Sequence, residues 1–486
     1  MTKPLPDSPN WEQLQKQAKE LLKAVQSQDS SAVNRFKEFH PEYSSNSPAE
    51  ILSAPHALAD AQLTLAREYG YGSWPKLKAY IKSIPLHGKL KSAIDANDFA
   101  QVMQLLKSTP ELISAPIGYG KQGPLTWAAE CRGVATPPSE ARLEIARFLI
   151  DASADIHERG DGPLMRAALN GGRIPMMELL VSRGADVNAL WQGNYPILFA
   201  PCESVQPASI KWLLDHGADP NIQGNYDSVS SRPLDFVLGS YGRTPKLKEC
   251  IELLIQAGGT GACGDFASMP IHRGRLDLLE LAIDADPELV HRRFPEFNYG
   301  TTGARNLTLT GCTLLHVAAE FGELDAAKLL VERGADVNAT SLVDADGVGG
   351  QTPIFHAVTQ YDEYALETAR YLIEQGADLS VRAKIASAYD LPGETVFVTP
   401  LGYAVRFPAA HWETGKTHEF LLGFNAPAGD VYAAAKLGLV DELKALLQAG
   451  GDPNSTDPYG ETAIVVAGKR GHEEIVELLR KAAASG

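Results

Sequence analysis

The amino-acid sequence predicts an all-α solenoid, a stack of short helix–turn–helix units, preceded by a small helical leader. Three observations support this fold class. One phrase of roughly 33 residues recurs along the chain, as stacked repeat architectures require. Each copy contains two apolar stretches at helical spacing, separated and followed by glycine. The 486 residues include 43 glycines, many at the repeat ends, which favours one elongated array over two or three globular domains.

The clearest copy of the phrase is TLLHVAAEFGELDAAKLLVERGADVNA, residues 313–339. Thr313 is expected to cap a first helix by accepting a backbone N–H, and Gly322 is expected to end that helix. The second helix should end at Gly334 in the left-handed conformation, before a turn that suits Asp336 and Asn338. The apolar positions are Leu315, Ala318 and Ala319 in the first helix, and Ala326, Leu329, Leu330 and Val331 in the second. Such a unit has apolar surface on two sides and therefore needs neighbours.

Other copies of both halves of the phrase recur in register. The aspartate of the second half is found as Asp155, Asp186, Asp219, Asp336, Asp378 and Asp452, at separations close to whole multiples of one unit. The first halves are GPLTWAA, GPLMRAA, YPILFAP, RPLDFVL, TPIFHAV, TPLGYAV, DVYAAAKLG and TAIVVAG, beginning at residues 123, 162, 195, 232, 352, 399, 430 and 462. Proline in the second slot fits, because the first turn of a helix needs no hydrogen bond from it.

These phrases resemble the TPLH and GADVN phrases of ankyrin repeats, over residues 88–484. The resemblance implies about ten helix–turn–helix repeats with hairpin-like fingers and insertions. We expect a helical leader and N-terminal cap at residues 1–87, then an ankyrin-repeat array at 88–486 with its C-terminal cap at about 460–484. The histidine of TPLH survives only as His316, which we interpret as a turn-locking residue. Residues 264–289 have lost both phrases, so their register rests on spacing alone.

The leader contains several amphipathic helical stretches, of which WEQLQKQAKELLKAV from Trp11 is the clearest. The phrase LADAQLTLAREYGYGSWPKLKAYI resembles a short helical leader that precedes ankyrin arrays in bacterial proteins, which suggests a bacterial source. Its expected role is to cover the exposed apolar face of the first repeat. A separate docking role for this mildly basic segment is the alternative.

Charge and cysteine content exclude several classes of function. The formal net charge is −16, and residues 94–486 carry 32 Lys and Arg against 51 Asp and Glu, so the array should repel nucleic acid. The five cysteines are widely spaced and form no CxxC pair, which indicates reduced thiols and no zinc site. No apolar signal core or stretch of membrane length is present. We expect a cytoplasmic monomer without a cofactor, a metal ion or a membrane partner.

Insertions next to the repeats carry aromatic residues, and repeat proteins commonly bind partners through such loops. The finger candidates are Tyr119, Trp191, Tyr226, Tyr299 and Tyr389, with Phe297 and Tyr459 as further members of the row. A row of exposed rings would anchor a peptide or protein partner. The alternative is that each ring packs on its own loop.

A second set of candidates comes from the inner face of the array. In the ankyrin register, the fifth, eighth and ninth positions of each first helix tend to face the concave groove. These groove candidates include Trp127, Glu130, Arg166, Phe199, Glu203, Phe236, His272, Arg273, Glu320, Phe321, His356, Tyr403 and Arg406. The set suits a ligand groove in which aromatic rings supply area and arginines supply orientation. A solvated helix face is the simpler alternative.

The sequence therefore predicts a protein- or peptide-binding scaffold without chemistry of its own. The alternative is a small-molecule or enzymatic groove that uses Glu130, Glu203, His272, Glu320 and His356, residue types able to transfer protons. No spacing among them matches a known catalytic or metal-binding motif, so we assign no catalytic residue.

Overall fold

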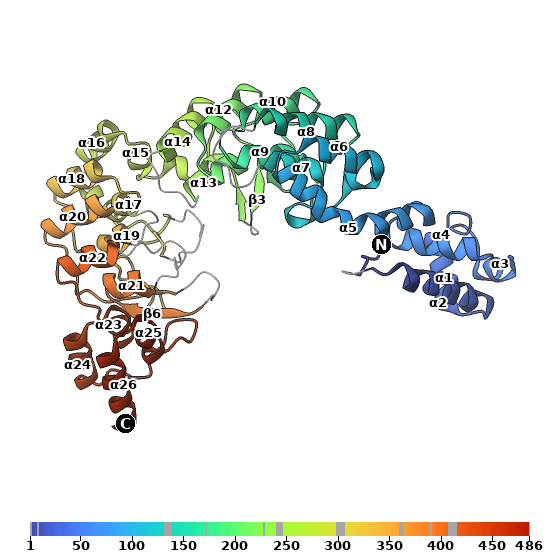
Figure 1. The fold of residues 1–486 in the computed structure, drawn as a ribbon. Coiled ribbons are helices and arrows are strands. Elements are labelled where there is room, and N and C mark those ends of the chain that lie inside the picture. Colours follow the sequence, from blue (N-terminus) through green and yellow to red (C-terminus); the bar gives the residue numbers. More distant parts are fainter. Residues whose placement is uncertain are drawn as a thin grey trace. The chain divides into compact units, whose positions relative to one another are not determined.

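The computed structural model describes residues 2–6, 9–130, 139–171, 173–226, 229–239, 246–297, 307–358, 364–387, 391, 393–406 and 416–485. The chain divides into two compact units. The first comprises Met1–Ala167 and Arg173–Ala185, and the second comprises Ala168–Gly172 and Asp186–Gly486. Each unit consists of paired helices, and the predicted all-α solenoid is confirmed (Figure 1). Within the described ranges, no helix has the length and hydropathy that crossing a membrane requires.

The first unit begins with a four-helix leader that has its own apolar core. Its helices are α1 (Trp11–Gln26), α2 (Ser30–Phe39), α3 (Pro48–Ser53) and α4 (Leu58–Glu68). Leu21, Phe36 and Leu65 are buried at its centre. Asn10 and Asp29 cap α1 and α2 by accepting first-turn backbone N–H groups, which explains why these helices begin where they do.

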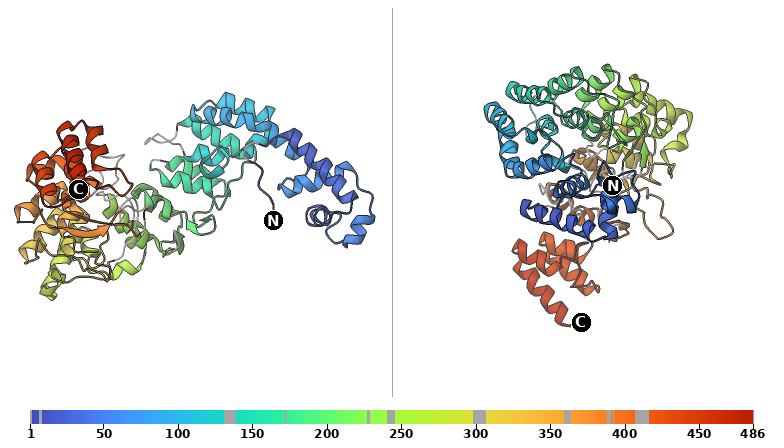
Figure 2. Two further views of the ribbon diagram at one scale, coloured as in Figure 1. Left: turned by 90° about the horizontal axis from the view of Figure 1, so that it is seen from below. Right: turned by 90° about the vertical axis from the view of Figure 1, so that its right-hand side faces the viewer.

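Helix α5 (Trp74–Asp95) connects the leader to the first repeat as one 22-residue helix (Figure 2). Ser73 caps its start, and Pro85 lies inside it without ending it. The helix therefore runs across residue 87, where we placed the boundary between leader and array. Leu77 belongs to the leader core at one end of α5, whereas Asp95 at the other end contacts the first repeat.

Short helices complete the first unit, and their lengths are typical of repeat proteins. They are α6 (Phe99–Ser108), η1 (Pro110–Ser114), η2 (Tyr119–Lys121), α7 (Pro124–Glu130), α8 (Glu140–Asp151), α9 (Gly162–Leu169) and α10 (Ile174–Ser182). Helix α7 packs against α8, and α8 packs against both α6 and α10. Each helix thus covers the apolar side of a neighbour that it could not cover alone.

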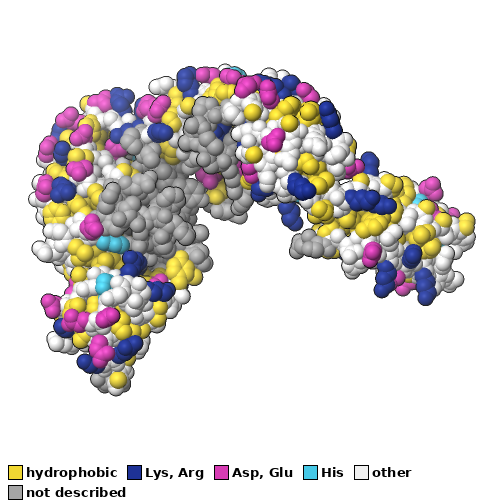
Figure 3. All heavy atoms as spheres, viewed as in Figure 1, with side chains coloured by type: hydrophobic (Ala, Val, Ile, Leu, Met, Phe, Trp, Pro, Cys, Tyr) yellow, Lys and Arg dark blue, Asp and Glu magenta, His cyan; other side chains and the backbone are white. Residues whose placement is uncertain are grey.

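The second unit repeats the same helix pair. Its helices are α11 (Phe199–Glu203), α12 (Pro207–Asp215), α13 (Pro233–Leu238), α14 (Lys246–Gln256), η3 (Ala262–Asp265), α15 (Met269–His272), α16 (Leu276–Ala285), η4 (Pro287–Val290), α17 (Leu314–Glu320), α18 (Leu324–Glu332), α19 (Pro353–Ala357), α20 (Leu366–Glu374), α21 (Pro400–Arg406), α22 (Lys416–Gly423), α23 (Val431–Leu437), α24 (Val440–Gln448), α25 (Ala463–Arg470) and α26 (Glu473–Ser485). Residues 264–289, placed by spacing alone, form a helix pair here too. Charged side chains of both signs cover the outer helices α16, α18 and α20 (Figure 3).

Three two-stranded antiparallel hairpins form the fingers of the second unit. They pair β1 (Leu190–Trp191) with β2 (Tyr195–Pro196), β3 (Gly224–Tyr226) with β4 (Val229–Ser231), and β5 (Ala383–Ala386) with β6 (Thr395–Val398). Figure 1 shows β3 extending away from the helix layers. These fingers confirm the hairpin-like connections implied by the ankyrin resemblance.

At three junctions among the described residues, an asparagine in the phrase GADxN ties one repeat to the next. Its side chain donates to the backbone carbonyl of the glycine that ends the next second helix, and it accepts a backbone N–H two residues later. The donor bonds are Asn188–Gly217 at 2.9 Å, Asn221–Gly258 at 2.9 Å and Asn338–Gly376 at 3.0 Å. The accepted bonds come from Asp219, Thr260 and Asp378, each at 2.8 Å. We call this pair of bonds the asparagine clamp.

The glycines that end second helices have positive φ, both in the clamps, with +89° at Gly217, +85° at Gly258 and +93° at Gly376, and after α18. Gly334 follows α18 with φ +92°, as predicted, and a Cβ built there meets no atom within 4 Å. Any penalty for a side chain at this position therefore comes from the backbone conformation alone, because L-residues with branched side chains disfavour positive φ.

We expect Gly334→Val to lower the free energy of unfolding by about 1 kcal/mol or more, for that backbone reason. Gly423→Val is the matched control, since Gly423 also has open space around its Cβ position but does not have a positive φ. Urea denaturation of the parent and both variants measures the difference. Equal midpoints for Gly334→Val and the control would contradict the assignment of strain.

Candidate partner-binding surface

Five aromatic rings from two neighbouring fingers and two first helices meet in the second unit. We call this group the finger aromatic cluster: Trp191, Tyr195, Phe199, Tyr226 and Phe236. The rings of Phe199 and Phe236 stack with centroids 4.1 Å apart. Tyr195 packs edge-on against all four other rings, at centroid distances of 5.6 to 6.1 Å. Four of the five were candidates from the sequence, and the structure unites the finger set with the groove set.

Local sequence explains why these rings meet. Gln192 and Gly193 have φ of +52° and +80°, which allows the tight turn that pairs Trp191 with Tyr195. The two fingers are joined by a hydrogen bond from the Asn225 backbone N–H to the Asn194 carbonyl, at 2.8 Å. A Cβ at Gly224 would lie 2.9 Å from the Phe199 ring, so this close approach of the second finger needs glycine.

The finger aromatic cluster has a buried base and a more accessible rim. Phe199, Tyr195 and Phe236 are buried, whereas Trp191 and Tyr226 are half-buried. The Tyr195 hydroxyl donates to the Glu203 carboxylate at 2.7 Å. Burial, together with the nearby Glu203, raises the pKa of Tyr195, so the phenol stays protonated as a donor. The arrangement presents two rigid rings beside a carboxylate, which suits an apolar or cationic side chain of a partner.

A second group of candidates forms a buried polar network around α17 and α19. His356 Nδ1 lies 3.0 Å from a Glu320 carboxylate oxygen, and His356 Nε2 lies 3.8 Å from Cys312 Sγ. This order of thiol, imidazole and carboxylate matches the groups of a nucleophilic triad. All three residues are buried, however, and burial raises the pKa of the Cys312 thiol, with Glu320 adding to the increase. The thiolate that nucleophilic chemistry requires is therefore disfavoured.

His316 locks the turn before α17, as predicted. Its Nδ1 accepts the Thr313 backbone N–H at 3.2 Å, and its Nε2–H donates to the Gln351 carbonyl at 3.0 Å. This pattern fixes a neutral tautomer, and burial lowers the pKa of His316 to about 3. Thr313 is the N-cap residue of α17, and its hydroxyl pairs with His316 Nδ1 at 2.9 Å.

Further groove candidates of the second unit pair with residues of neighbouring repeats. His272 packs edge-on against Phe321, with ring centroids 4.3 Å apart. Arg273 bonds the Glu252 carboxylate. Arg406 bonds Asp430 and lies 4.7 Å from the centroid of the Tyr432 ring, while Tyr403 is buried in α21. These contacts join adjacent repeats, so most of these side chains already serve the stack.

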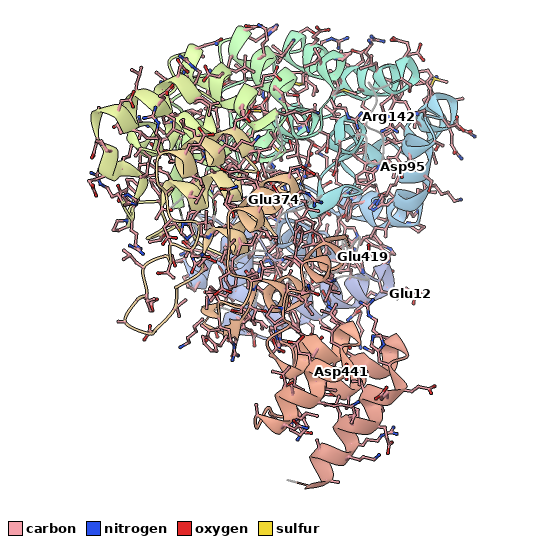
Figure 4. The ribbon with its side chains drawn as sticks, turned by 90° about the vertical axis from the view of Figure 1, so that its left-hand side faces the viewer. Glu12, Asp95, Arg142, Glu374, Glu419 and Asp441 are labelled. Atoms are coloured by element: carbon pink, nitrogen blue, oxygen red, sulfur yellow. The ribbon has the colours of Figure 1, made fainter. Side chains whose placement is uncertain are left out.

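In the first unit, three groove candidates are likewise occupied. Trp127 donates its indole N–H to Asp95 at 2.8 Å, and the Lys91 ammonium lies 4.2 Å from its ring centroid. Glu130 and Arg166 approach to 4.0 Å. Arg142 extends from α8 towards α5, where it contacts the Asp95 carbonyl at 3.4 Å; Figure 4 labels both residues.

Most of the groove candidates are buried, so they do not line an open groove as expected. Ten of the thirteen groove candidates are buried, and only Glu203, Arg273 and Arg406 are half-buried. They do not form a solvated line, because rings and ion partners from adjacent repeats and fingers close over them. Phe297 is also buried, stacked on Phe294 with centroids 4.4 Å apart, whereas Tyr459 is 51% exposed as expected of a finger.

Some candidates lie outside the described residues, and others were missed. Tyr299 and Tyr389 fall outside the described ranges, as does the side chain of Tyr119. Tyr195 and Tyr432 were not selected, although Tyr195 holds the finger aromatic cluster together and Tyr432 receives Arg406. The available signal was that each is a large residue in the opening positions of a first-half phrase, where the clearest copy has threonine or leucine.

Comparison with known proteins agrees with the fold. The profile of the family described as "Ankyrin repeats (3 copies)" matches residues 138–224 and 246–383. Residues 138–224 and 246–383 are ankyrin repeats. The ankyrin-repeat chain is 23% identical to human transient receptor potential cation channel subfamily A member 1 over 70% of its length and 35% of the relative. It is 22% identical to the mouse B-cell lymphoma 3 protein homolog, over 48% of the chain and 39% of the relative.

A shorter match is closer in sequence. The ankyrin-repeat chain is 39% identical to rat ankyrin repeat and SAM domain-containing protein 6, over 17% of the chain and 8% of that protein. The chain therefore spans well under half of the length of each of these relatives. A shared fold of this kind does not imply a shared activity.

The buried, neutral His316 makes the stability of the fold depend on pH. Unfolded His316 titrates near its ordinary value of 6.5 and folded His316 near 3, so the unfolded chain binds one more proton between these values. Stability from this residue is complete above pH 6.5 and falls as the pH drops towards 3. We expect His316→Gln to weaken the pH dependence of the free energy of unfolding between pH 5 and 7, by up to about 1.4 kcal/mol per pH unit. Urea denaturation at each pH measures this free energy.

The Gln variant also loses buried hydrogen bonds, so its stability at pH 7 should fall by about 1 to 3 kcal/mol. His157→Gln is the control, because the His157 side chain is 62% exposed. A parent and a His316→Gln variant with parallel pH profiles would show that His316 titrates normally in the fold.

Proposed function

We propose that this ankyrin-repeat chain binds a protein or peptide partner through the fingers of its second unit, with the finger aromatic cluster as the anchor. The observation that carries the proposal is the half-buried pair Trp191 and Tyr226, held on three buried rings. Rigid aromatic side chains on a packed base lose little conformational freedom on binding, which is why such residues dominate binding energy at interfaces.

Charge supports a cationic partner. The second unit carries 23 Lys and Arg against 40 Asp and Glu, a formal charge of −17, whereas the first unit carries 21 against 20. A strongly negative unit accelerates association with positively charged proteins and opposes association with nucleic acid. Glu203, beside the finger aromatic cluster, places part of this charge at the proposed anchor.

We expect Trp191→Ala and Tyr226→Ala each to weaken partner binding by about 1 to 3 kcal/mol, because each removes an anchor ring without removing the buried base. A partner captured by pull-down from the source cell supplies the ligand, and titration calorimetry measures the affinity. Tyr459→Ala is the matched control, since Tyr459 is an exposed finger ring outside the cluster. If both cluster variants retain full affinity while the control loses it, the anchor is assigned to the wrong finger.

The alternative function is an enzyme built on the Cys312–His356–Glu320 network, and its accessibility decides between the two. Because Cys312 is buried and the pKa of its thiol is raised, we expect iodoacetamide at neutral pH to leave it unmodified in the native chain. In urea it should react fully. Peptide mapping by mass spectrometry measures both states.

Cys202, Cys250 and Cys263 are buried as well and serve as internal references. Faster native labelling at Cys312 than at these three, lost on His356→Gln, would indicate an activated nucleophile and support the enzymatic alternative.

A further inference from the structure

A tyrosine-lined groove in the first unit lies apart from the finger aromatic cluster. Its cavity of about 580 Å³ is bounded on one side by Tyr69, Tyr71, Tyr80 and His87. Tyr80, Ile84 and His87 follow one stripe of α5, at the spacing that places side chains on a single helix face. The ring centroids of Tyr71 and Tyr80 are 5.1 Å apart, and those of Tyr80 and His87 are 6.0 Å apart. A row of rings packed at tilted angles thus forms one wall.

The opposite wall is a proline-rich segment of the same chain. Residues 2–9 read TKPLPDSP, with proline at positions 4, 6 and 9, and Thr2–Pro6 and Pro9 line the cavity. The Lys3 backbone N–H donates to the Glu68 carbonyl at 2.6 Å, and the Lys3 ammonium lies 5.7 Å from the Tyr69 ring centroid. Leu5 packs against the leader core. Figure 1 shows the N-terminal end beside α5.

The chemistry of the two walls is that of proline recognition. Proline-rich segments favour an extended helix with few conformations, and they dock on grooves lined by aromatic rings at a low entropic cost. Here the aromatic wall, the prolines and a backbone hydrogen bond to the segment are all present. The segment leaves Pro4 and Pro6 exposed, and the remaining cavity falls in the size range of ligand sites. The segment therefore covers the groove without filling it.

We propose that this groove is a binding site for extended proline-rich peptides, and that Thr2–Pro6 and Pro9 occupy it in competition with such a peptide from a partner. The groove is independent of the finger aromatic cluster, so the two sites would bind different ligands. Lys3 and Lys121 line the groove, and their positive charges favour a peptide that has an acidic residue among its prolines. The chain's own sequence TKPLPDSP has such a residue, Asp7.

The test compares the full chain with a variant that lacks residues 2–9 and is otherwise complete. The probe is a fluorescein-labelled peptide TKPLPDSPN, followed by fluorescence anisotropy. A matched peptide, TKALADSAN, keeps the charges and replaces the prolines. We expect the shortened chain to bind the proline peptide at least fivefold more tightly than the full chain does, and to bind the alanine peptide at least fivefold more weakly than the proline peptide. Tyr80→Ala in the shortened chain should weaken binding of the proline peptide about tenfold.

Hydrogen exchange gives a second readout that does not depend on a labelled probe. Deleting residues 2–9 should speed amide exchange around Glu68–Tyr71 and at the start of α5, and the proline peptide should restore protection. Thermal melting checks that Tyr80→Ala is folded. The proposal is overturned if the shortened chain binds neither peptide, if it binds both equally, or if the full chain binds the proline peptide as tightly as the shortened chain.

Discussion

The fold depends on the fact that no single repeat can bury its own apolar surface. A first helix of five to seven residues, such as α17 or α19, is too short to be stable alone in water. Neighbouring repeats supply the missing contacts, and at three junctions of the described residues the asparagine clamp joins them through two hydrogen bonds each. Because the clamp uses the backbone of the helix-ending glycine, the conformation of that glycine and the stacking of the array are linked.

This constraint explains why the fold could be predicted from sequence. Gly334 is left-handed and His316 locks its turn, as predicted. Asn338 was predicted only as a turn residue, and its bond to Gly376 of the next repeat was not predicted. The boundary between leader and array was harder, because α5 continues through it and no breaking residue marks the passage; even Pro85 is accommodated.

The candidate site was predictable only in part. Helical register identified Phe199 and Phe236, and the aromatic residues of the insertions identified Trp191 and Tyr226. Neither observation predicts that the rings of two fingers pack against those of two first helices. That arrangement depends on the turn at Gln192 and Gly193 and on the space left by Gly224, which are tertiary facts. For the same reason, register alone placed Glu320 and His356 in a groove, whereas neighbouring repeats bury them as a polar network.

Helix α5 connects two sets of contacts that are distant along the chain. Tyr80 and His87 line the tyrosine-lined groove. Asp95 lies roughly 22 Å from Tyr80 along the helix, at a rise of about 1.5 Å per residue, and accepts the indole N–H of Trp127. Pro85 lies inside this helix and supplies no backbone N–H donor there, yet the helix continues through it. Because one helix carries both sets of contacts, a peptide held by Tyr80 and His87 would bind to the same element that orients Trp127 of the first repeat.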